Sequence, residues 1–505
     1  MRSEKALKNM VASLMLQMVV FLSGIILPKF FLEAYGSSVN GMVTSVNQFL
    51  MYLGLAEAGV GTASVVALYG PLARKDEKEI NSILSATRIF YNRSGMLFLG
   101  MVVILVGIYP YLITQQLSSG LVRAMIVVLA SSMLVDYFGI GKYKVLLTAS
   151  QKGYVVSLIQ AVGTILNMII TIVMILVGVS AVMVKGVATA VYILRFFLVR
   201  VYVKKHFSYV SYHEKPNFVS LSQRGAALLH QVVGIIVNNT DVVLLTICLG
   251  ATSLVEVSVY GIYNMIVYAV NLLLTSFSNG LTAGFGEVVS KGEKEVLKKS
   301  FSSYEYMYMI VLFIICVCMG VLILPFISVY TANIKDADYM RPVAAMMFTL
   351  IVFLQNVRIP GQTIISAAGH FRETRRQAVL EAVINVGVSL ALIWKFGMVG
   401  VLFGTICSYL YRSIEIILYN RRIFVKGTGK TTAKRIMRNL LFSLILMWCA
   451  MKVVPQQMAS FTEWFVYAVA VAVVSSGVVI AVNYIFEPNE CKSLLGRLAG
   501  SVRKL

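Results

Sequence analysis

Charged residues are scarce in this 505-residue chain, where they make up 13% of the sequence against about 25% in a typical soluble domain. Acidic residues are the rarest, with 22 Asp and Glu against 44 Lys and Arg, and apolar residues reach 58%. This composition excludes a soluble globular protein. Apolar runs about 20 residues long recur along the whole chain, and each is long enough to cross a hydrocarbon core about 30 Å thick. The composition therefore predicts a multi-pass membrane protein.

Residues that hold metals or form disulfides are also few. The four histidines are scattered, and the six cysteines show no metal-ligand spacing. Most of the cysteines lie inside apolar runs, where cysteine usually serves as a small packing residue. The sequence therefore predicts neither a metal site nor a bound cofactor.

Fourteen spans can be placed on the apolar runs, and together they predict an all-α membrane fold. The first follows the basic segment MRSEKALKN without a small-residue cleavage signal, so we expect an uncleaved first span. The predicted spans cover residues 10–33, 40–69, 94–116, 120–148, 154–179, 182–203, 224–249, 257–289, 303–330, 341–369, 377–396, 398–420, 436–454 and 462–486.

The lysines and arginines predict the orientation of these spans. With this assignment 36 of the 44 lie on the side of the N-terminus and 7 on the other side, while Arg358 lies within a span. Cytoplasmic loops of membrane proteins carry such an excess of positive charge, so we expect both termini in the cytoplasm. The basic loops would face anionic lipid headgroups, which accounts for the net charge of +22 without nucleic acid.

An internal repeat relates spans 1–6 to spans 7–12. RKDEKEI at 74–80 matches SKGEKEV at 290–296, and further pairs follow at nearly the same offset. These pairs are Gly41 with Gly261, Pro110 with Pro325, Asn167 with Asn385, and Arg195 with Arg412. Because six spans is an even number, the repeat predicts two six-helix lobes related by a pseudo-two-fold axis along the membrane normal.

The repeat also predicts the domain boundaries. We expect a first lobe at 1–203, a linker at 204–223, a second lobe at 224–420, a basic loop at 421–435, two further helices within 436–486 and a tail at 487–505. Two like lobes with a cleft between them would suit rocking between inward-open and outward-open states.

The stretch GTGKTT at 427–432 resembles the end of a phosphate-binding loop. Such a loop needs a glycine five residues before its Gly-Lys pair, where this chain has Phe424, and it needs a preceding strand. A short basic connection between two spans provides neither. We therefore interpret GTGKTT as an ordinary cytoplasmic loop.

Two acidic residues lie inside predicted spans, where ionisable groups usually face a cavity or a partner. Glu57, in LGLAEAGVG, is surrounded by small residues that allow another helix to approach. Asp241 shares one helical face with His230, and Asn238 borders that face. A thinner polar stripe on the first span includes Gln17. Either these groups line a cavity, with Glu57 and Asp241 binding a coupling ion, or they bond to neighbouring helices.

Arg358 is the basic residue at mid-depth of a span. Pro360 and Gly361 follow it, so the helix should break there. An arginine at a broken helix could hold a phosphate, or it could pair with Glu57 or Asp241. Its counterpart in the repeat is near Lys142. Arg195 and Arg412 lie nearer the cytoplasmic interface, where we expect their side chains to snorkel.

Over nearly its whole length, the chain resembles the polysaccharide-biosynthesis flippases of the multidrug/oligosaccharidyl-lipid/polysaccharide (MOP) exporter superfamily. The segments that carry the resemblance are SGIILPKFFLEAYGSSVNGMVTSVNQFLMYLGLAEAG at 23–59, YGPLARKDEKEINSIL at 69–84 and DVVLLTICLGATSLVEVSVYGIYNMI at 241–266. The family's patterns are diffuse and include no invariant catalytic residues, so they identify the superfamily better than the substrate.

The resemblance implies movement of an undecaprenyl-pyrophosphate-linked oligosaccharide across a bacterial cytoplasmic membrane by alternating access, for cell-surface polysaccharide. It implies H⁺ or Na⁺ as a possible coupling ion, and polysaccharide polymerases or glycosyltransferases as possible partners. In fourteen-span members the last two helices are thought to accommodate the lipid tail. Members often have several cations in the cavity, whereas this chain has Arg358 at mid-depth and Lys29, Lys142 and Lys144 nearer the span ends.

Three other functions remain open at this point. A cation-coupled multidrug exporter of the MATE branch typically has twelve spans, so the two extra spans argue against it. A membrane enzyme such as a glycan polymerase would usually need a large external loop with acid and base residues, and the predicted external loops are short. A non-transporting assembly partner for glycosyltransferases is the third possibility.

Overall fold

The computed structural model describes residues 2–57, 60–113, 116–218, 224–279, 282–425 and 429–492. For residues 2–6, 56, 224–233, 238, 276–279 and 282–283 it describes the backbone alone. The described residues are overwhelmingly helical, and they contain no strand. This agrees with the predicted all-α fold, because a chain in hydrocarbon must satisfy its backbone hydrogen bonds within helices.

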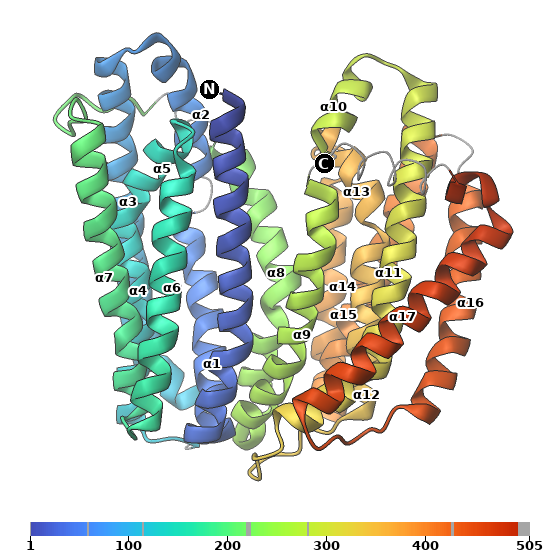
Figure 1. The fold of residues 1–505 in the computed structure, drawn as a ribbon. Coiled ribbons are helices and arrows are strands. Elements are labelled where there is room, and N and C mark those ends of the chain that lie inside the picture. The colour runs from blue at the N-terminus through green and yellow to red at the C-terminus, as the bar shows by residue number, and fades with distance from the viewer. Residues whose placement is uncertain are drawn as a thin grey trace. The chain divides into compact units, whose positions relative to one another are not determined.

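Two compact units divide the chain, and Figure 1 shows their helices. The first unit is Met1–Val259, and its boundary with the second falls inside α9 (Ser253–Asn279). Its other helices are α1 (Arg2–Leu53), α2 (Val60–Arg74), α3 (Glu77–Leu112), α4 (Ser119–Val135), α5 (Gly141–Ala149), α6 (Gly153–Leu176), α7 (Ala181–His206) and α8 (Arg224–Cys248). Its buried core includes Met42, Leu68, Phe98 and Tyr109.

The second unit is Tyr260–Leu505. It contains α10 (Thr282–Ser290), α11 (Lys294–Tyr330), α12 (Pro342–Val357), α13 (Ile359–Ala367), α14 (Arg375–Phe396), α15 (Met398–Ile423), α16 (Gly429–Val453) and α17 (Phe461–Phe486). An apolar cluster around Val317, Val321, Val454 and Val471 packs α16 and α17 against α11. Because α8 packs with the first unit, this division differs from the boundaries that the repeat suggests, and those boundaries remain a prediction.

Twelve helices in the described part of the chain are long and apolar enough to cross a membrane. The sequence predicted fourteen spans, and the described residues of each of the fourteen are largely helical. Span one and the first part of span two lie in α1, whose helical backbone is interrupted at Gly36 (φ 80°, ψ 173°). The described apolar stretch of α8 is the short segment Asn239–Cys248. The multi-pass fold is confirmed, while the count of fourteen remains a prediction.

The helix boundaries repeat along the chain. Helix α3 begins at Glu77 and α11 begins at Lys294, 217 positions later. Helices α7 and α15 show the same shift at both ends, since they cover Ala181–His206 and Met398–Ile423. The offset of 215–220 found in the sequence therefore relates whole helices as well as single residues.

Several predicted spans are interrupted where polar residues lie. The second span was expected to be continuous, but α1 ends at Leu53, a 3₁₀ turn covers Gly54–Glu57 and α2 begins at Val60. A π-helical turn at Asp136–Ile140 separates α4 from α5. The break predicted at Arg358 is confirmed, because α12 ends at Val357 and α13 begins at Ile359. These breaks free backbone groups and redirect side chains within the membrane-spanning region.

The described part of the GTGKTT segment lies at the beginning of a helix. Helix α15 ends at Ile423 and α16 begins at Gly429, while Gly427 and Thr428 lie outside the described residues. The described residues before GTGKTT are helix α15 followed by a turn, so the strand that a phosphate loop requires is missing there. Gly429 to Thr432 form the beginning of α16, so the expectation of a loop is wrong for these four residues, while the interpretation that the segment is not a nucleotide-binding loop is retained.

Close backbone contact inside the first unit yields a stability prediction. A Cβ atom at Gly41 of α1 would lie 1.7 Å from the carbonyl oxygen of Leu254, whereas one at Gly24 of the same helix would meet nothing within 4 Å. We expect Gly41→Ala to destabilise the protein by about 1–3 kcal/mol, as overpacking usually does. Gly24→Ala should be neutral or slightly stabilising, since alanine favours helix.

The melting temperatures of both variants in detergent, compared with that of the parent, test this expectation. An unchanged melting temperature for Gly41→Ala would contradict the tight contact between Gly41 and Leu254.

Candidate functional site

Glu57 lies in a polar cluster inside the first unit. It is the last residue of the 3₁₀ turn, and its side chain forms a hydrogen bond with Tyr91 of α3. Asp136, in the π-helical turn, and Lys144, on α5, are close enough to act on its charge. Two carboxyl groups and one lysine therefore lie within electrostatic reach of one another in this cluster. The structure thus places Glu57 and Lys144 in one cluster.

Small residues make this cluster possible. A Cβ atom at Gly61 would lie 3.1 Å from the Tyr91 hydroxyl and 4.0 Å from a Glu57 carboxyl oxygen. A Cβ atom at Gly141 would lie 2.2 Å from the Tyr91 ring. Gly61, one of the small residues next to Glu57, and Gly141, which sequence reasoning did not single out, therefore admit Tyr91 beside the Glu57 carboxyl group.

Asp241 lies at a second place, on α8, where it is 4% exposed. The preceding residue, Thr240, shares a hydrogen bond with Tyr52 of α1 at 2.6 Å between the two oxygens. Asp241 is close enough to Tyr52 to act on it electrostatically. Its carboxyl group is therefore buried near the end of α1, just before the turn that carries Glu57.

Hydroxyl and amide groups line the contact between α1 and α8 and continue onto the beginning of α9. Asn40 donates to Ser258 over 2.8 Å, and the Ser45 and Thr246 hydroxyls are 2.7 Å apart. With the Tyr52–Thr240 bond, these three pairs form what we call the hydroxyl contact. No ion pair is among the three. Neutral hydrogen bonds of this kind exchange with water at a small net cost.

Arg358 belongs to an ion-pair cluster in the second unit. Its Nη1 atom donates to Glu381 of α14, and its guanidinium carbon lies 4.7 Å from the centre of the Tyr409 ring. Arg412 lies 3.5 Å from the other Glu381 oxygen and donates to Glu415 over 2.7 Å. The cluster therefore alternates two arginines with two glutamates.

Sequence reasoning missed Glu381 and Glu415, although both fall inside predicted spans. It weighed Glu57 and Asp241 as acid partners for Arg358, but the structure pairs Arg358 with Glu381. The Nε atom of Arg358 is buried and has no hydrogen-bond partner within the described residues. Arg358 therefore retains one donor that its partners in the chain do not use.

The two repeats place arginine in equivalent contacts. Arg195 donates to Thr164 over 3.0 Å in the first unit, and Arg412 contacts Glu381 in the second. Each residue of the second pair follows its counterpart by 217 positions. Both arginines are 8% exposed, so the expectation that they snorkel to the interface is wrong. They are buried because each finds an oxygen partner on the neighbouring helix.

The remaining predicted site residues are dispersed. Lys29 lies 4.0 Å from Glu33 on the same helix, and the ammonium group of Lys142 lies over the rings of Tyr143 and Tyr212 at 5.2 and 5.4 Å. Gln17 is half-buried on α1. The side chains of His230 and Asn238 lie outside the described residues. The proposed roles of these groups in substrate binding therefore remain predictions.

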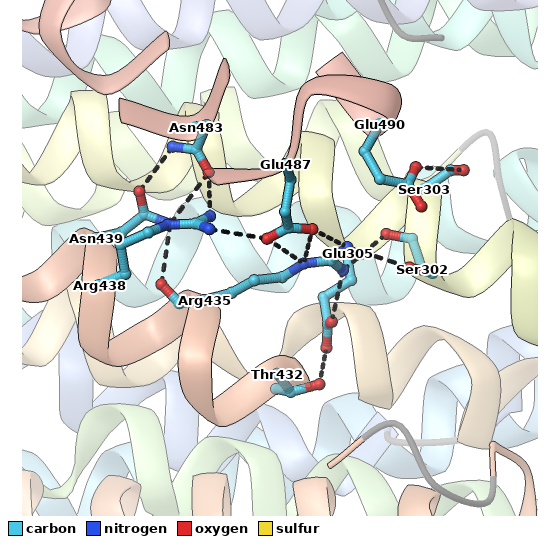
Figure 2. Close-up of polar contacts among 10 residues, drawn as sticks. All are labelled: Ser302, Ser303, Glu305, Thr432, Arg435, Arg438, Asn439, Asn483, Glu487 and Glu490. Atoms are coloured by element: carbon cyan, nitrogen blue, oxygen red, sulfur yellow. Dashed lines mark hydrogen bonds and ion pairs between the residues drawn. The ribbon is translucent and has the colours of Figure 1, made fainter. Parts of the chain in front are cut away.

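A further ion network joins α11, α16 and the end of α17, and Figure 2 shows its members. Arg435, which is 2% exposed, donates to Glu487 over 2.6 Å and to Glu305 over 3.2 Å. Arg438 also donates to Glu487, over 2.9 Å. Glu305 additionally accepts from Thr432 over 2.7 Å. Sequence reasoning did not single out Glu305, although it lies within a predicted span.

Glu487 follows the last residue of α17, and opposing effects set its pKa. Burial raises the pKa of this carboxyl group, but the hydrogen bonds and charges of Arg435 and Arg438 outweigh burial and hold it below the ordinary value. Glu487 is therefore ionised at neutral pH and serves as the anion between the buried Arg435 and the partly buried Arg438.

Comparison with known proteins finds similarity among solved structures. No protein-family model and no curated protein matches the sequence. An inward-facing multidrug resistance MATE family transporter of the MOP superfamily is similar at TM-score 0.66 and 14% identity, covering 85% of this chain and 99% of that one. The lipid II flippase MurJ, in an inward closed conformation, is similar at TM-score 0.70 and 14% identity, covering 94% of this chain and 99% of that one.

A MOP superfamily transporter from Pyrococcus furiosus is also similar, at TM-score 0.57 and 13% identity, covering 84% of this chain and 96% of that one. These similar proteins are transporters and a flippase rather than enzymes. At such low identity the similarity establishes the fold. The chain is therefore a multi-pass membrane protein with the fold of the MOP superfamily transporters.

Proposed function

We propose that this protein moves an oligosaccharide linked to undecaprenyl pyrophosphate across a bacterial cytoplasmic membrane, for cell-surface polysaccharide biosynthesis. A pyrophosphate group cannot cross hydrocarbon unaided, so the protein must supply cations and hydrogen-bond donors in place of water. Arg358 at its helix break is the group we assign to the pyrophosphate. Lys29, Lys142, Lys144, Gln17, His230 and Asn238 are assigned to the rest of the substrate.

Coverage of the chain supports a flippase over a drug exporter. The lipid II flippase leaves 6% of this chain unmatched, whereas the multidrug transporter leaves 15%. Helices α16 and α17 lie outside the internal repeat, and a lipid-linked substrate gives them a role beside its tail. A cation-coupled multidrug exporter is the second candidate, since at least six similar solved structures are MATE transporters.

The hydroxyl contact is the observation that most directly supports a mechanism of alternating access. It joins α1, from the first repeat, to α8 and α9, from the second, at the end that the charge distribution assigns to the outside. Because its bonds are neutral and exchangeable with water, this contact can open and close during a transport cycle. Glu57 and Asp241 flank its inner end, and we assign coupling by H⁺ or Na⁺ to them.

Arg358→Ala tests the binding role of Arg358. Export should fall about tenfold or more, because a hydrogen bond to a charged group contributes about 1.5–3 kcal/mol. Export in cells and the amount of inserted protein are measured together. Arg123→Ala, at an exposed position of α4, is the control and should leave export near the parent level.

Glu381→Gln distinguishes a role of Arg358 in substrate binding from a purely structural role. If Arg358 serves the substrate, this variant keeps its fold and retains more export than Arg358→Ala. Equal loss of inserted protein in both variants would reduce Arg358 to a structural partner of Glu381.

A disulfide across the hydroxyl contact tests alternating access. Cysteines replace Ser45 and Thr246 in a chain whose six native cysteines are removed, since the two hydroxyls are only 2.7 Å apart. We expect oxidation to stop export and reduction to restore it. The control pair is Ser131 and Thr189, whose hydroxyls are 2.8 Å apart on α4 and α7 within one repeat. Normal export with the Ser45–Thr246 bridge formed would exclude movement at this contact.

Deletion of the gene tests the proposed identity of the substrate. The readout is the pool of lipid-linked oligosaccharides, by mass spectrometry, together with the membrane leaflet that holds them. Complete repeat units should accumulate on the cytoplasmic face. An unchanged lipid pool with altered sensitivity to cationic drugs would instead indicate the exporter.

A further inference from the structure

A cavity of about 420 Å³ opens between the beginning of α11 and the beginning of α16. Its volume falls within the range of about 300–1,000 Å³ that is typical of small-molecule sites. Polar and charged residues dominate its lining. The lining residues are Glu295, Lys298, Lys299, Phe301, Ser302, Glu305, Thr431 and Arg435.

The inner wall of this cavity belongs to the ion network in which two cations, Arg435 and Arg438, face two anions, Glu305 and Glu487. Arg435 donates to both Glu305 and Glu487, and its Nη1 atom also reaches the Ser302 carbonyl oxygen over 3.1 Å. Thr432 donates to the remaining oxygen of Glu305. These groups therefore provide a rigid polar surface, because their hydrogen bonds and charges are used within the network.

The outer wall carries charges that do not balance. Lys298 and Lys299 are exposed, and neither forms an ion pair or hydrogen bond with any residue that the structure describes. Glu295 is the other charged residue of this wall. The outer wall therefore has a net charge of about +1 at neutral pH, since lysines and glutamates are then ionised. Thr431, at the beginning of α16, adds a hydroxyl group.

We propose that this cavity binds a singly charged phosphodiester, such as the headgroup of an anionic phospholipid. Two lysine ammonium groups and a threonine hydroxyl suit the oxygens of a phosphate, and the single excess charge matches one phosphodiester. Glu295 disfavours a polyphosphate such as a nucleotide, because it would repel additional negative charge. Thr431 belongs to GTGKTT, so that stretch contributes to a phosphate site without being a nucleotide-binding loop.

The position in the fold favours a lipid as the source of the phosphate. Helices α11 and α16 both enter the membrane-spanning region directly after these residues, and the charge distribution assigns this end to the cytoplasmic face. The cytoplasmic leaflet of a membrane is anionic and attracts such lysines. Free phosphate shares the same chemistry, so the experiment must distinguish the two sources. The site is independent of the transported substrate.

Native mass spectrometry of the full-length protein in detergent tests the proposal, with phosphatidylglycerol and zwitterionic phosphatidylcholine as probes. The variant carries Lys298→Gln and Lys299→Gln. The matched control carries Lys204→Gln and Lys205→Gln, another exposed pair of adjacent lysines at the predicted cytoplasmic end of a helix, α7. We expect retention of one phosphatidylglycerol to fall about tenfold or more in the variant and to persist in the control.

The source of the phosphate follows from competition with inorganic phosphate. Selective retention of phosphatidylglycerol that inorganic phosphate does not displace assigns the site to a lipid headgroup. A rise in melting temperature with inorganic phosphate alone, lost in the variant, assigns it to soluble phosphate. Equal lipid retention by parent and variant, with no response to inorganic phosphate, overturns the proposal. Thr431→Val gives an independent check of phosphate binding in the cavity, because it removes the Thr431 hydroxyl donor and leaves the charge of the cavity unchanged.

Discussion

The absence of water in the bilayer core is the constraint on which the rest of this structure depends. Every backbone donor and acceptor must be satisfied within the protein, so the membrane-spanning chain folds as helices. The same constraint acts on side chains, because an ionisable group in hydrocarbon needs a partner. Arg358 with Glu381, Arg412 with Glu415 and Arg435 with Glu305 and Glu487 are the clearest results. Several of the charges that lie within the membrane-spanning helices are therefore gathered in ion-pair clusters.

The helix breaks explain where these clusters form. Glu57 ends a 3₁₀ turn, Asp136 begins a π-helical turn and Arg358 separates two helices. At each break, a backbone that departs from the regular helix directs a polar side chain toward other helices. A continuous helix would carry such a residue at a fixed angle, with fewer ways to reach a partner. The breaks thus connect a local feature of the chain to the chemistry that a transporter of charged substrates requires.

The two additional helices illustrate how polar and apolar packing cooperate. Apolar residues such as Val321 and Val471 hold α16 and α17 against α11 along part of their length. At one end, Arg435 fixes the register of the three helices, because its donors require Glu305, Glu487 and Ser302 at defined positions. Apolar contacts alone would allow the helices to slide. The same network forms the inner wall of the cavity whose outer wall carries Lys298 and Lys299.

The sequence by itself determined the class of the protein, its internal repeat and the break at Arg358. These features depend on local properties, namely the length of apolar runs, the offset between similar segments and the restriction that Pro360 imposes on its helix. Only the tertiary structure decided which groups meet. Glu381 and Glu415 are ordinary residues of their own spans in the sequence, and Arg195 and Arg412 look like interfacial arginines. Their partners lie on other helices, and helix packing brings them together. The residue pattern of any one span therefore does not predict the pair.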